Sequence, residues 1–167
     1  MIIGITEFPA IREKYLDGII VFCSGSFDLI HTAHVKFLRS HYSFKDSRSH
    51  LVVAVASDKM ISCLKPGRPI NDEMERLKMV NYVIPGDYCY LDTASTPNEP
   101  LACLSHAFKN LKPDVYMVND EAFDLDVRRS FCEAYGVEMK ILKRDWESIS
   151  TTKIIEKVLD ANTGKSQ

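Results

Sequence analysis

Apolar runs of strand length alternate along this chain with stretches whose apolar residues recur at the helical period. This alternation constrains the fold most, because it is the pattern of a parallel sheet whose strands are joined by crossover helices. Continuous, β-branched runs such as "HLVVAVAS" are typical of strands that are covered on both faces. We therefore predict an α/β fold with a five-stranded, mainly parallel sheet and helices on both faces. Strands are expected at 18–24, 50–57, 81–85, 114–119 and 137–142, with the weakest pattern at 81–85.

Helices are predicted between these strands and at both ends of the chain, at 7–16, 33–42, 58–64, 72–80, 101–111, 123–135 and 151–161. The polar, proline-bearing stretch 86–100 indicates a long surface loop. No repeat or linker interrupts this order. We expect one domain over 1–167, with its core at 18–160.

The composition narrows the classes of partner. With 167 residues, 46% of them hydrophobic, the chain suits one domain with a real core. A net charge of −2 gives no bulk attraction to nucleic acid or to anionic membranes, so neither is an expected partner. Five cysteines without a C-x-x-C pair indicate reduced thiols, and no apolar run has the length of a signal or a membrane span. We predict a cytoplasmic protein.

The segment "CSGSFDLIHTAH" at 23–34 follows the first strong strand. Ligands of open α/β sheets lie outside the carboxyl ends of the strands, and Gly25 permits a tight turn there. The next helix would offer free N–H groups to a phosphate, and His31 and His34 would project from the same side of its start. A phosphate site is one interpretation. The alternatives are two solvent-facing or capping histidines, and a zinc pair that lacks an evident third ligand.

Two further segments contain residues that could bind anions. In "SISTTKIIEKVL", at 148–159, Ser150, Thr151 and Thr152 stand where a helical period begins, so they either cap that helix or hold phosphate oxygens. The stretch after Ser57 supplies the cations Lys65, Arg68 and Arg76, which would otherwise belong to a solvated face. Their position after strand ends favours one polyanion site over three unrelated features.

Together these residues resemble the cytidylyltransferase-like nucleotidyltransferases of the class I synthetase superfamily. The resemblance spans roughly 19–158 and rests on "GSFDLIHTAH" and "ISTTKI", which are similar to the two end motifs of that family. "SDKMISCLKPGRPIN" is similar to the corresponding stretch of heptose-phosphate nucleotidyltransferases, and "ISTTKI" also resembles glycerol-phosphate cytidylyltransferase. The resemblance implies a Rossmann-like domain, and relatives that are often homodimers.

The resemblance also implies a reaction. A phosphate monoester (of a sugar, polyol or amino alcohol) would attack the α-phosphorus of CTP or, as the alternative, ATP, and pyrophosphate would leave. Magnesium would be carried by the triphosphate, with no protein metal site. By carry-over, the catalytic group would be His31, His34, Lys65 and Arg76, and Arg68 and Arg144 would bind substrate phosphate. Nucleotide would contact Ser24, Gly25, Ser26, Phe27, Asp28, Ala33, Asn119, Asp120, Ser150, Thr151 and Thr152.

The sequence departs from the family pattern in several places. Ala33 replaces a glycine between the two histidines, and we expect it to form a volume-conserving pair with Ala122 beside the base. Asn119 and Asp120 also differ from the family pattern beside the base, so the sequence does not decide between CTP and ATP as the nucleotide donor. The distance from Arg76 to 81–85 indicates a helix shortened by about one and a half turns. Arg144 lies one residue farther from the motif "ISTTKI" than the corresponding arginine of the family does. A nucleotide-binding regulator without turnover is the alternative function.

Overall fold

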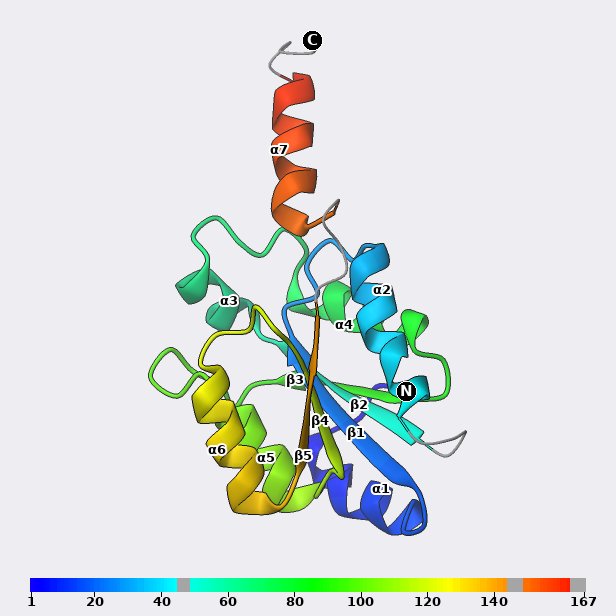
Figure 1. Cartoon of the computed structure of the whole chain (residues 1–167). Coiled ribbons are helices and arrows are strands. Elements are labelled where there is room, and N and C mark those ends of the chain that lie inside the picture. Colours follow the sequence, from blue (N-terminus) through cyan, green and yellow to red (C-terminus); the bar gives the residue numbers. More distant parts are fainter. Residues whose placement is uncertain (45–48, 144–148, 163–167) are drawn as a thin grey trace.

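The computed structural model describes residues 1–44, 49–143 and 149–162 (Figure 1). The short 3₁₀ helices η1 and η2 cover Ile5–Glu7 and Ser40–Ser43. The strands are β1 (Ile19–Gly25), β2 (Ser49–Ala56), β3 (Tyr88–Asp92), β4 (Val115–Asn119) and β5 (Glu138–Leu142). The α-helices are α1 (Phe8–Lys14), α2 (Thr32–Arg39), α3 (Asp58–Leu64), α4 (Glu73–Val83), α5 (Ala102–Asn110), α6 (Leu125–Tyr135) and α7 (Thr151–Asn162).

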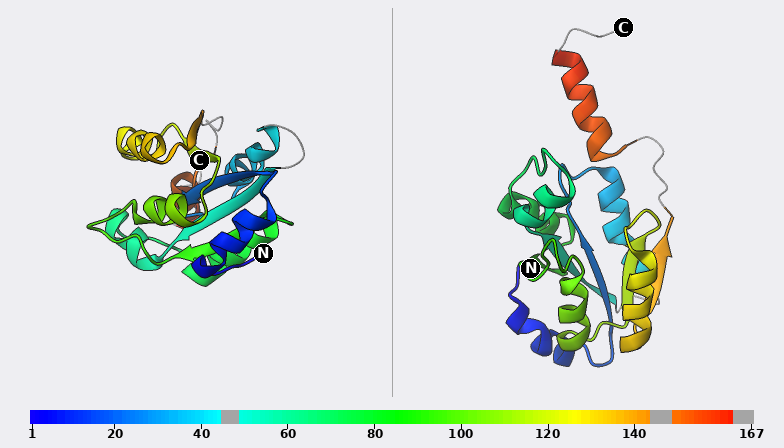
Figure 2. Two further views of the ribbon diagram at one scale, coloured as in Figure 1. Left: turned by 90° about the horizontal axis from the view of Figure 1, so that it is seen from below. Right: turned by 90° about the vertical axis from the view of Figure 1, so that its left-hand side faces the viewer.

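The five strands form one parallel sheet in the order β3-β2-β1-β4-β5. Helices lie on both of its faces (Figure 2), so the predicted α/β architecture is confirmed, with every strand pair parallel. One core lies under α1, α5 and α6 and contains Phe22 and Phe108, and the other lies under α2 and α4 and contains Phe37 and Leu77. No helix within the described ranges is long and apolar enough to cross a membrane.

The predicted strand at 81–85 is wrong, and so is part of the predicted loop at 86–100. Residues 81–83 complete α4, and the chain turns at Gly86, whose φ of +92° suits a residue without a β-carbon. The strand lies at Tyr88–Asp92, where the side chains of Tyr88 and Tyr90 are buried. Because the shortened helix depended on a strand at 81–85, the structure gives that departure no support.

The buried carboxylate of Asp87 joins the turn before β3 to its neighbours. Asp87 Oδ1 accepts a hydrogen bond of 2.8 Å from the backbone N–H of Leu51 in β2. Its Oδ2 lies 3.3 Å from Nε2 of His41, an ion-pair contact without hydrogen-bond alignment, and both side chains are buried. The other ring nitrogen of His41 lies 2.7 Å from the carbonyl oxygen of Leu38 at the end of α2. Asp87 therefore connects β2, β3 and α2.

We predict that Asp87→Ala lowers the free energy of unfolding by about 3 kcal/mol, because it leaves the buried N–H of Leu51 without its acceptor and removes the carboxylate beside the buried imidazole of His41. Urea denaturation followed by circular dichroism measures the loss. Asp87→Asn, which retains one carbonyl oxygen for Leu51, should lose less. The exposed Asp17→Ala is the matched control, and equal stability of the Asp17 and Asp87 variants would contradict this role.

Candidate active site

A cavity of about 700 Å³ lies at the carboxyl ends of the strands. In the order β3-β2-β1-β4-β5 the chain leaves β1 toward β2 but returns to β4 on its other side, and open α/β sheets bind ligands at such a switch point. Ser24 and Gly25 at the end of β1 and Val118 and Asn119 at the end of β4 all line the cavity. The location predicted for the site is the location of this cavity.

The turn after β1 is held in an unusual backbone conformation. Phe27 and Leu29 have φ values of +51° and +46°, in the left-handed region that side chains with a β-carbon rarely adopt. Phe27 is buried, and its ring packs so near Gly25 that a β-carbon there would lie 3.0 Å from it. Gly25 therefore permits a close approach, which in this structure comes from Phe27. Such strain persists only where neighbouring contacts hold it.

The carboxylate of Asp28 supplies those contacts, between the two strained residues. Its Oδ2 accepts hydrogen bonds from Nη1 of Arg68 at 2.9 Å and from the N–H of Ile70 at 3.0 Å. Its Oδ1 accepts from the N–H of Asn71 at 3.1 Å. The backbone oxygen of Asp28 accepts a 2.7 Å bond from the hydroxyl of Thr151. One residue thus joins the turn after β1, the segment 68–71 and the start of α7.

These bonds also fix the charge of Asp28. Burial acts to raise the pKa of its carboxyl, but the hydrogen bonds from Ile70, Asn71 and Arg68 outweigh it, and the pKa lies below its ordinary value. An unfolded aspartate titrates near pH ~3.9. The stabilisation is therefore complete above that pH and is lost as the pH falls through the lower pKa of the folded state.

His31 and His34 lie together at the start of α2, and both line the cavity. Their ring centroids are 4.0 Å apart. The backbone N–H of His31 points to Nδ1 of His34 at 3.4 Å, so the capping alternative is present alongside the cavity position. Because Nδ1 of His34 accepts this bond, the proton of a neutral ring belongs on Nε2.

The start of α7 borders the same cavity. Ser150 caps the helix, since its hydroxyl accepts the N–H of Lys153 at 3.2 Å. Thr151 reaches Asp28, and the hydroxyl of Thr152 lies 3.4 Å from Nη2 of Arg68. All three of the predicted hydroxyl residues line the cavity, and α7 then extends away from the body of the molecule (Figure 1).

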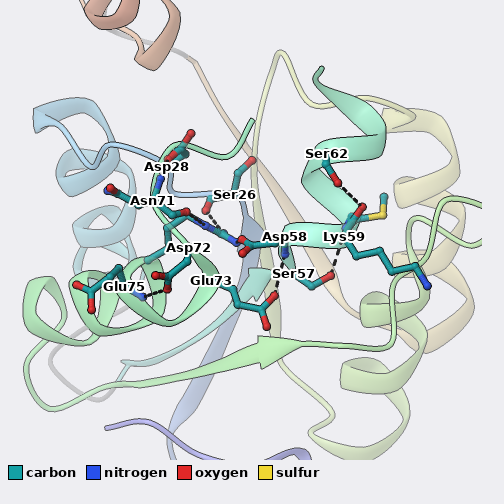
Figure 3. A network of polar contacts seen from close by, with 12 residues as sticks. Ser26, Asp28, Ser57, Asp58, Lys59, Ser62, Asn71, Asp72, Glu73 and Glu75 are labelled. Carbon is teal, nitrogen blue, oxygen red and sulfur yellow. Dashed lines mark hydrogen bonds and ion pairs between the residues drawn. The ribbon is translucent and has the colours of Figure 1, made fainter. Parts of the chain in front are cut away.

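The predicted cations have different surroundings. Lys65 and Arg68 line the cavity. Arg76 is fully buried outside its lining, and its guanidinium donates to Ser26 O at 2.6 Å, to Asn71 O at 3.0 Å and to Asp58 Oδ1 at 2.8 Å. Figure 3 shows the network in which Ser26, Asp58 and Asn71 meet. The expected catalytic role of Arg76 does not fit this placement, because the hydrogen-bond donors of its guanidinium already serve the protein.

Two other predicted residues also fall outside the cavity lining. Ala33 is 1% exposed and Asp120 lies on the surface, and neither lines the cavity. Ala122 does line it, so the expected contact of Ala33 and Ala122 with a common base has no support from the cavity shape. Arg144 lies outside the described residues. The other predicted nucleotide contacts, including Ser24, Ser26, Phe27 and Asn119, border the cavity.

The structure adds cavity residues that the sequence patterns did not reveal. Asp92 ends β3 and Ser95 follows it. The sequence pattern predicted this strand too early, and the correct strand end would have pointed to Asp92. Arg128 lies in α6, where no motif distinguished it from its neighbour Arg129. No group of three or more His, Cys, Asp or Glu residues that could hold a metal ion is found among residues 1–44, 49–143 and 149–162.

We predict that Asp28→Asn accelerates hydrogen exchange of the Ile70 and Asn71 amides by at least about tenfold, because an amide replaces one acceptor oxygen and removes the charge that attracts Arg68. Exchange of assigned amides measured by NMR tests this. Asp72→Asn, a matched change at the cap of α4, should leave the exchange of both amides as it is. Unchanged exchange in Asp28→Asn would mean that other contacts hold the segment 68–71.

Comparison with known proteins identifies relatives over nearly the whole chain. The family model described as cytidylyltransferase-like matches residues 22–157. The bifunctional protein HldE of Alcanivorax borkumensis is 38% identical over 161 residues, which are 95% of this chain and 30% of that protein. HldE of Pseudomonas savastanoi pv. phaseolicola is 33% identical over 160 residues, again 95% of this chain and 30% of that protein. This chain therefore spans 30% of the length of these relatives.

Two solved structures share the fold of this chain. The lipopolysaccharide core biosynthesis protein of Thermoplasma volcanium has a TM-score of 0.55 and 27% identity, covering 76% of this chain and 96% of its own. Pantoate-β-alanine ligase of Francisella tularensis has a TM-score of 0.62 at 8% identity, covering 100% of this chain and 80% of its own, a likeness of fold alone. The resemblance carried by "GSFDLIHTAH" and "ISTTKI" is confirmed, and the chain belongs to the cytidylyltransferase-like family.

Proposed function

We propose that the chain is a nucleotidyltransferase that joins a nucleoside monophosphate to a small phosphate monoester and releases pyrophosphate. The observation that carries this proposal is the convergence of three distant segments, 24–34, 65–68 and 150–152, on one cavity at the switch point of the sheet. Each segment brings donors that suit phosphate oxygens: imidazoles, cations or hydroxyls with a helix start. Membership of the cytidylyltransferase-like family supports the same reaction.

In the proposed reaction an oxygen of the acceptor phosphate attacks the α-phosphorus of the triphosphate. The bond from that phosphorus to the oxygen bridging the β-phosphate breaks, and pyrophosphate leaves with the electron pair. The attacking oxygen is already ionised, so the protein mainly positions the reactants and stabilises charge. We assign this stabilisation to His31 and His34, with Nε2 of His34 as donor, and assign the contact between the two reactants to Lys65.

The assignment to phosphates agrees with the charges at the histidine pair. Two protonated imidazoles with centroids 4.0 Å apart would repel one another, and the positive end of α2 would add to this. A bound triphosphate supplies negative charge that reverses both effects. The hydroxyl of Thr152, which accepts from Arg68 and keeps its own proton, completes the proposed phosphate site from the start of α7.

We propose that magnesium enters the site bound to the triphosphate, which usually carries it. Bound there, Mg²⁺ would neutralise charge on the phosphate oxygens. The residues fit this arrangement better than a protein-held ion, because both carboxylate oxygens of Asp28 already accept hydrogen bonds from Arg68, Ile70 and Asn71. Turnover should therefore require added magnesium, and the protein without nucleotide should bind it weakly.

We propose ATP as the donor and a heptose phosphate as the acceptor, with CTP as the second candidate. Similarity to the HldE proteins over 95% of the chain favours the heptose-phosphate alternative over the cytidylyl transfer expected first. The relation to a protein of lipopolysaccharide core biosynthesis agrees with a sugar phosphate, because such cores are sugar chains. Pyrophosphate release from each nucleoside triphosphate, with heptose, glycerol and amino-alcohol phosphates as acceptors, tests the proposal.

The same assay distinguishes the proposed enzyme from the alternative, a nucleotide-binding regulator without turnover. Tight binding of a triphosphate without pyrophosphate release for any acceptor would favour the regulator. The arrangement of both histidines and Lys65 around the cavity supports turnover. The homodimer implied by the family resemblance stays a prediction, which light scattering at several protein concentrations tests.

We predict that His31→Ala and His34→Ala each lower turnover by about two to three orders of magnitude, the usual effect of losing one donor to the transition state. Steady-state pyrophosphate release measures this. His106→Ala, an exposed histidine on α5 outside the cavity lining, is the matched control and should retain full turnover. Near-normal turnover in both cavity variants, at an unchanged melting temperature, would refute the assignment.

A further inference from the structure

Arg128 is a buried cation on the wall of the cavity. It lies in α6, is 5% exposed, and lines the cavity together with Phe123. Its Nε donates to the carbonyl oxygen of Phe123 at 2.8 Å, and its Nη1 contacts the hydroxyl of Tyr116. The guanidinium carbon lies 4.6 Å from the centroid of the Phe123 ring. All of these partners are neutral groups.

The surroundings of the Arg128 guanidinium therefore differ from those of the other arginine side chains in this region. Arg68 lies 2.9 Å from a carboxylate oxygen of Asp28, and Arg76 lies 2.8 Å from one of Asp58. Arg128 forms no ion pair with any carboxylate in the described part of the chain. Arginine does not deprotonate in proteins, so its charge persists. A buried charge without a counter-ion is costly, and an anionic ligand would remove that cost.

The phenol of Tyr116 and the thiol of Cys103 do not supply the missing negative charge. Burial raises the pKa of Tyr116 to about 12, although Arg128 acts to lower it, so the phenol stays neutral at physiological pH. Burial likewise raises the pKa of the Cys103 thiol to about 12, again against the effect of Arg128. The hydrogen-bond partner Tyr116 and the neighbouring thiol of Cys103 are thus both uncharged, and neither balances the positive charge of Arg128 at the cavity wall.

Arg128 and the histidine pair belong to helices that cover opposite faces of the sheet. Tyr116 and Cys103 belong to the core face covered by α5 and α6, whereas Phe37 of α2, the helix that begins at the histidine pair, packs on the opposite face. The histidines and the start of α7 account for the phosphates of the nucleotide. A second anion, carried by the other reactant, would meet the wall formed by α5 and α6.

We propose that Arg128 binds the phosphate of the acceptor. This inference rests on the proposed function, in which the acceptor is a phosphate monoester. The guanidinium is held by Phe123 and Tyr116 before any ligand arrives, so little side-chain entropy is lost on binding. Charge-assisted bonds between arginine and phosphate are strong and directional. Arg128 would thereby set the requirement for an anionic acceptor and hold it opposite the α-phosphorus.

Titration of inorganic phosphate by calorimetry tests the inference directly. The full chain is titrated alone and when saturated with an α,β-methylene nucleoside triphosphate, which occupies the nucleotide site. The nucleotide-loaded wild-type protein should bind phosphate, and Arg128→Met should weaken this binding at least about tenfold, the loss expected for one charge-assisted contact. Arg129→Met, the exposed neighbour on the same helix, is the matched control and should bind phosphate as the wild type does. Nucleotide affinity should be the same in all three proteins.

Arg128→Gln covers the case in which Arg128→Met does not fold, because glutamine can still hydrogen bond to Tyr116 but carries no charge. It should lose phosphate binding to the same extent while its melting temperature stays near that of the wild type. Equal phosphate affinity in the wild type and a folded Arg128 variant would overturn the inference. So would absence of phosphate binding to the wild type, or a loss of nucleotide affinity in place of phosphate affinity.

Turnover separates this inference from the proposed function. If transfer occurs, Arg128→Gln should raise the KM of the acceptor at least about tenfold and leave the KM of the nucleotide unchanged. Transfer with an unchanged acceptor KM would refute the role of Arg128 and leave the function standing. Phosphate binding that depends on Arg128, without transfer to any acceptor, would refute the function and leave the anion site standing.

Discussion

The carboxylate of Asp28 is the group on which the arrangement of the cavity depends. It stands between two residues with left-handed backbone and accepts bonds from the segment 68–71, while its own carbonyl oxygen accepts the hydroxyl of Thr151. Strain of this kind costs on the order of 1–3 kcal/mol per residue and needs fixed partners. The turn after β1, the loop before α4 and the start of α7 are therefore held as one unit, and the charge of one carboxylate maintains it.

The cations near the cavity divide into two groups by the same reasoning. Arg68 is paired with Asp28, and Arg76 with Asp58. Arg76 also positions backbone, because it donates to two carbonyl oxygens. Lys65 and Arg128 form no ion pair with a described carboxylate, and both line the cavity. A site built this way presents positive charge only where an anionic reactant can reach it. Such preorganised charge is an effective means of stabilising phosphoryl transfer, because little reorganisation is needed during the reaction.

The fold could be predicted from the sequence because its signals are local. A buried parallel strand reads as a continuous apolar run, and four of the five strands were placed within two residues of their positions. The exception, 81–85, is an apolar helix end that resembles a strand over five residues. The true strand at Tyr88–Asp92 lies within the polar, proline-bearing stretch 86–100, which indicated a loop. Short apolar runs are ambiguous in this way, since helix and strand differ in period only over longer stretches.

The sequence by itself determined the α/β class, the family, and the position of the histidine pair and the hydroxyl residues, because strand ends and motif spacing are properties of neighbouring residues. Only the tertiary structure decided which charges are available. Arg76 and Asp28 have the residue types of ligands, yet their hydrogen bonds to Ser26, Asn71 and Ile70 commit them to the protein. Arg128 looks like any surface arginine in the sequence. The function proposed for Arg128 rests on burial without a counter-ion, which depends on residues distant in the chain and so is set by packing.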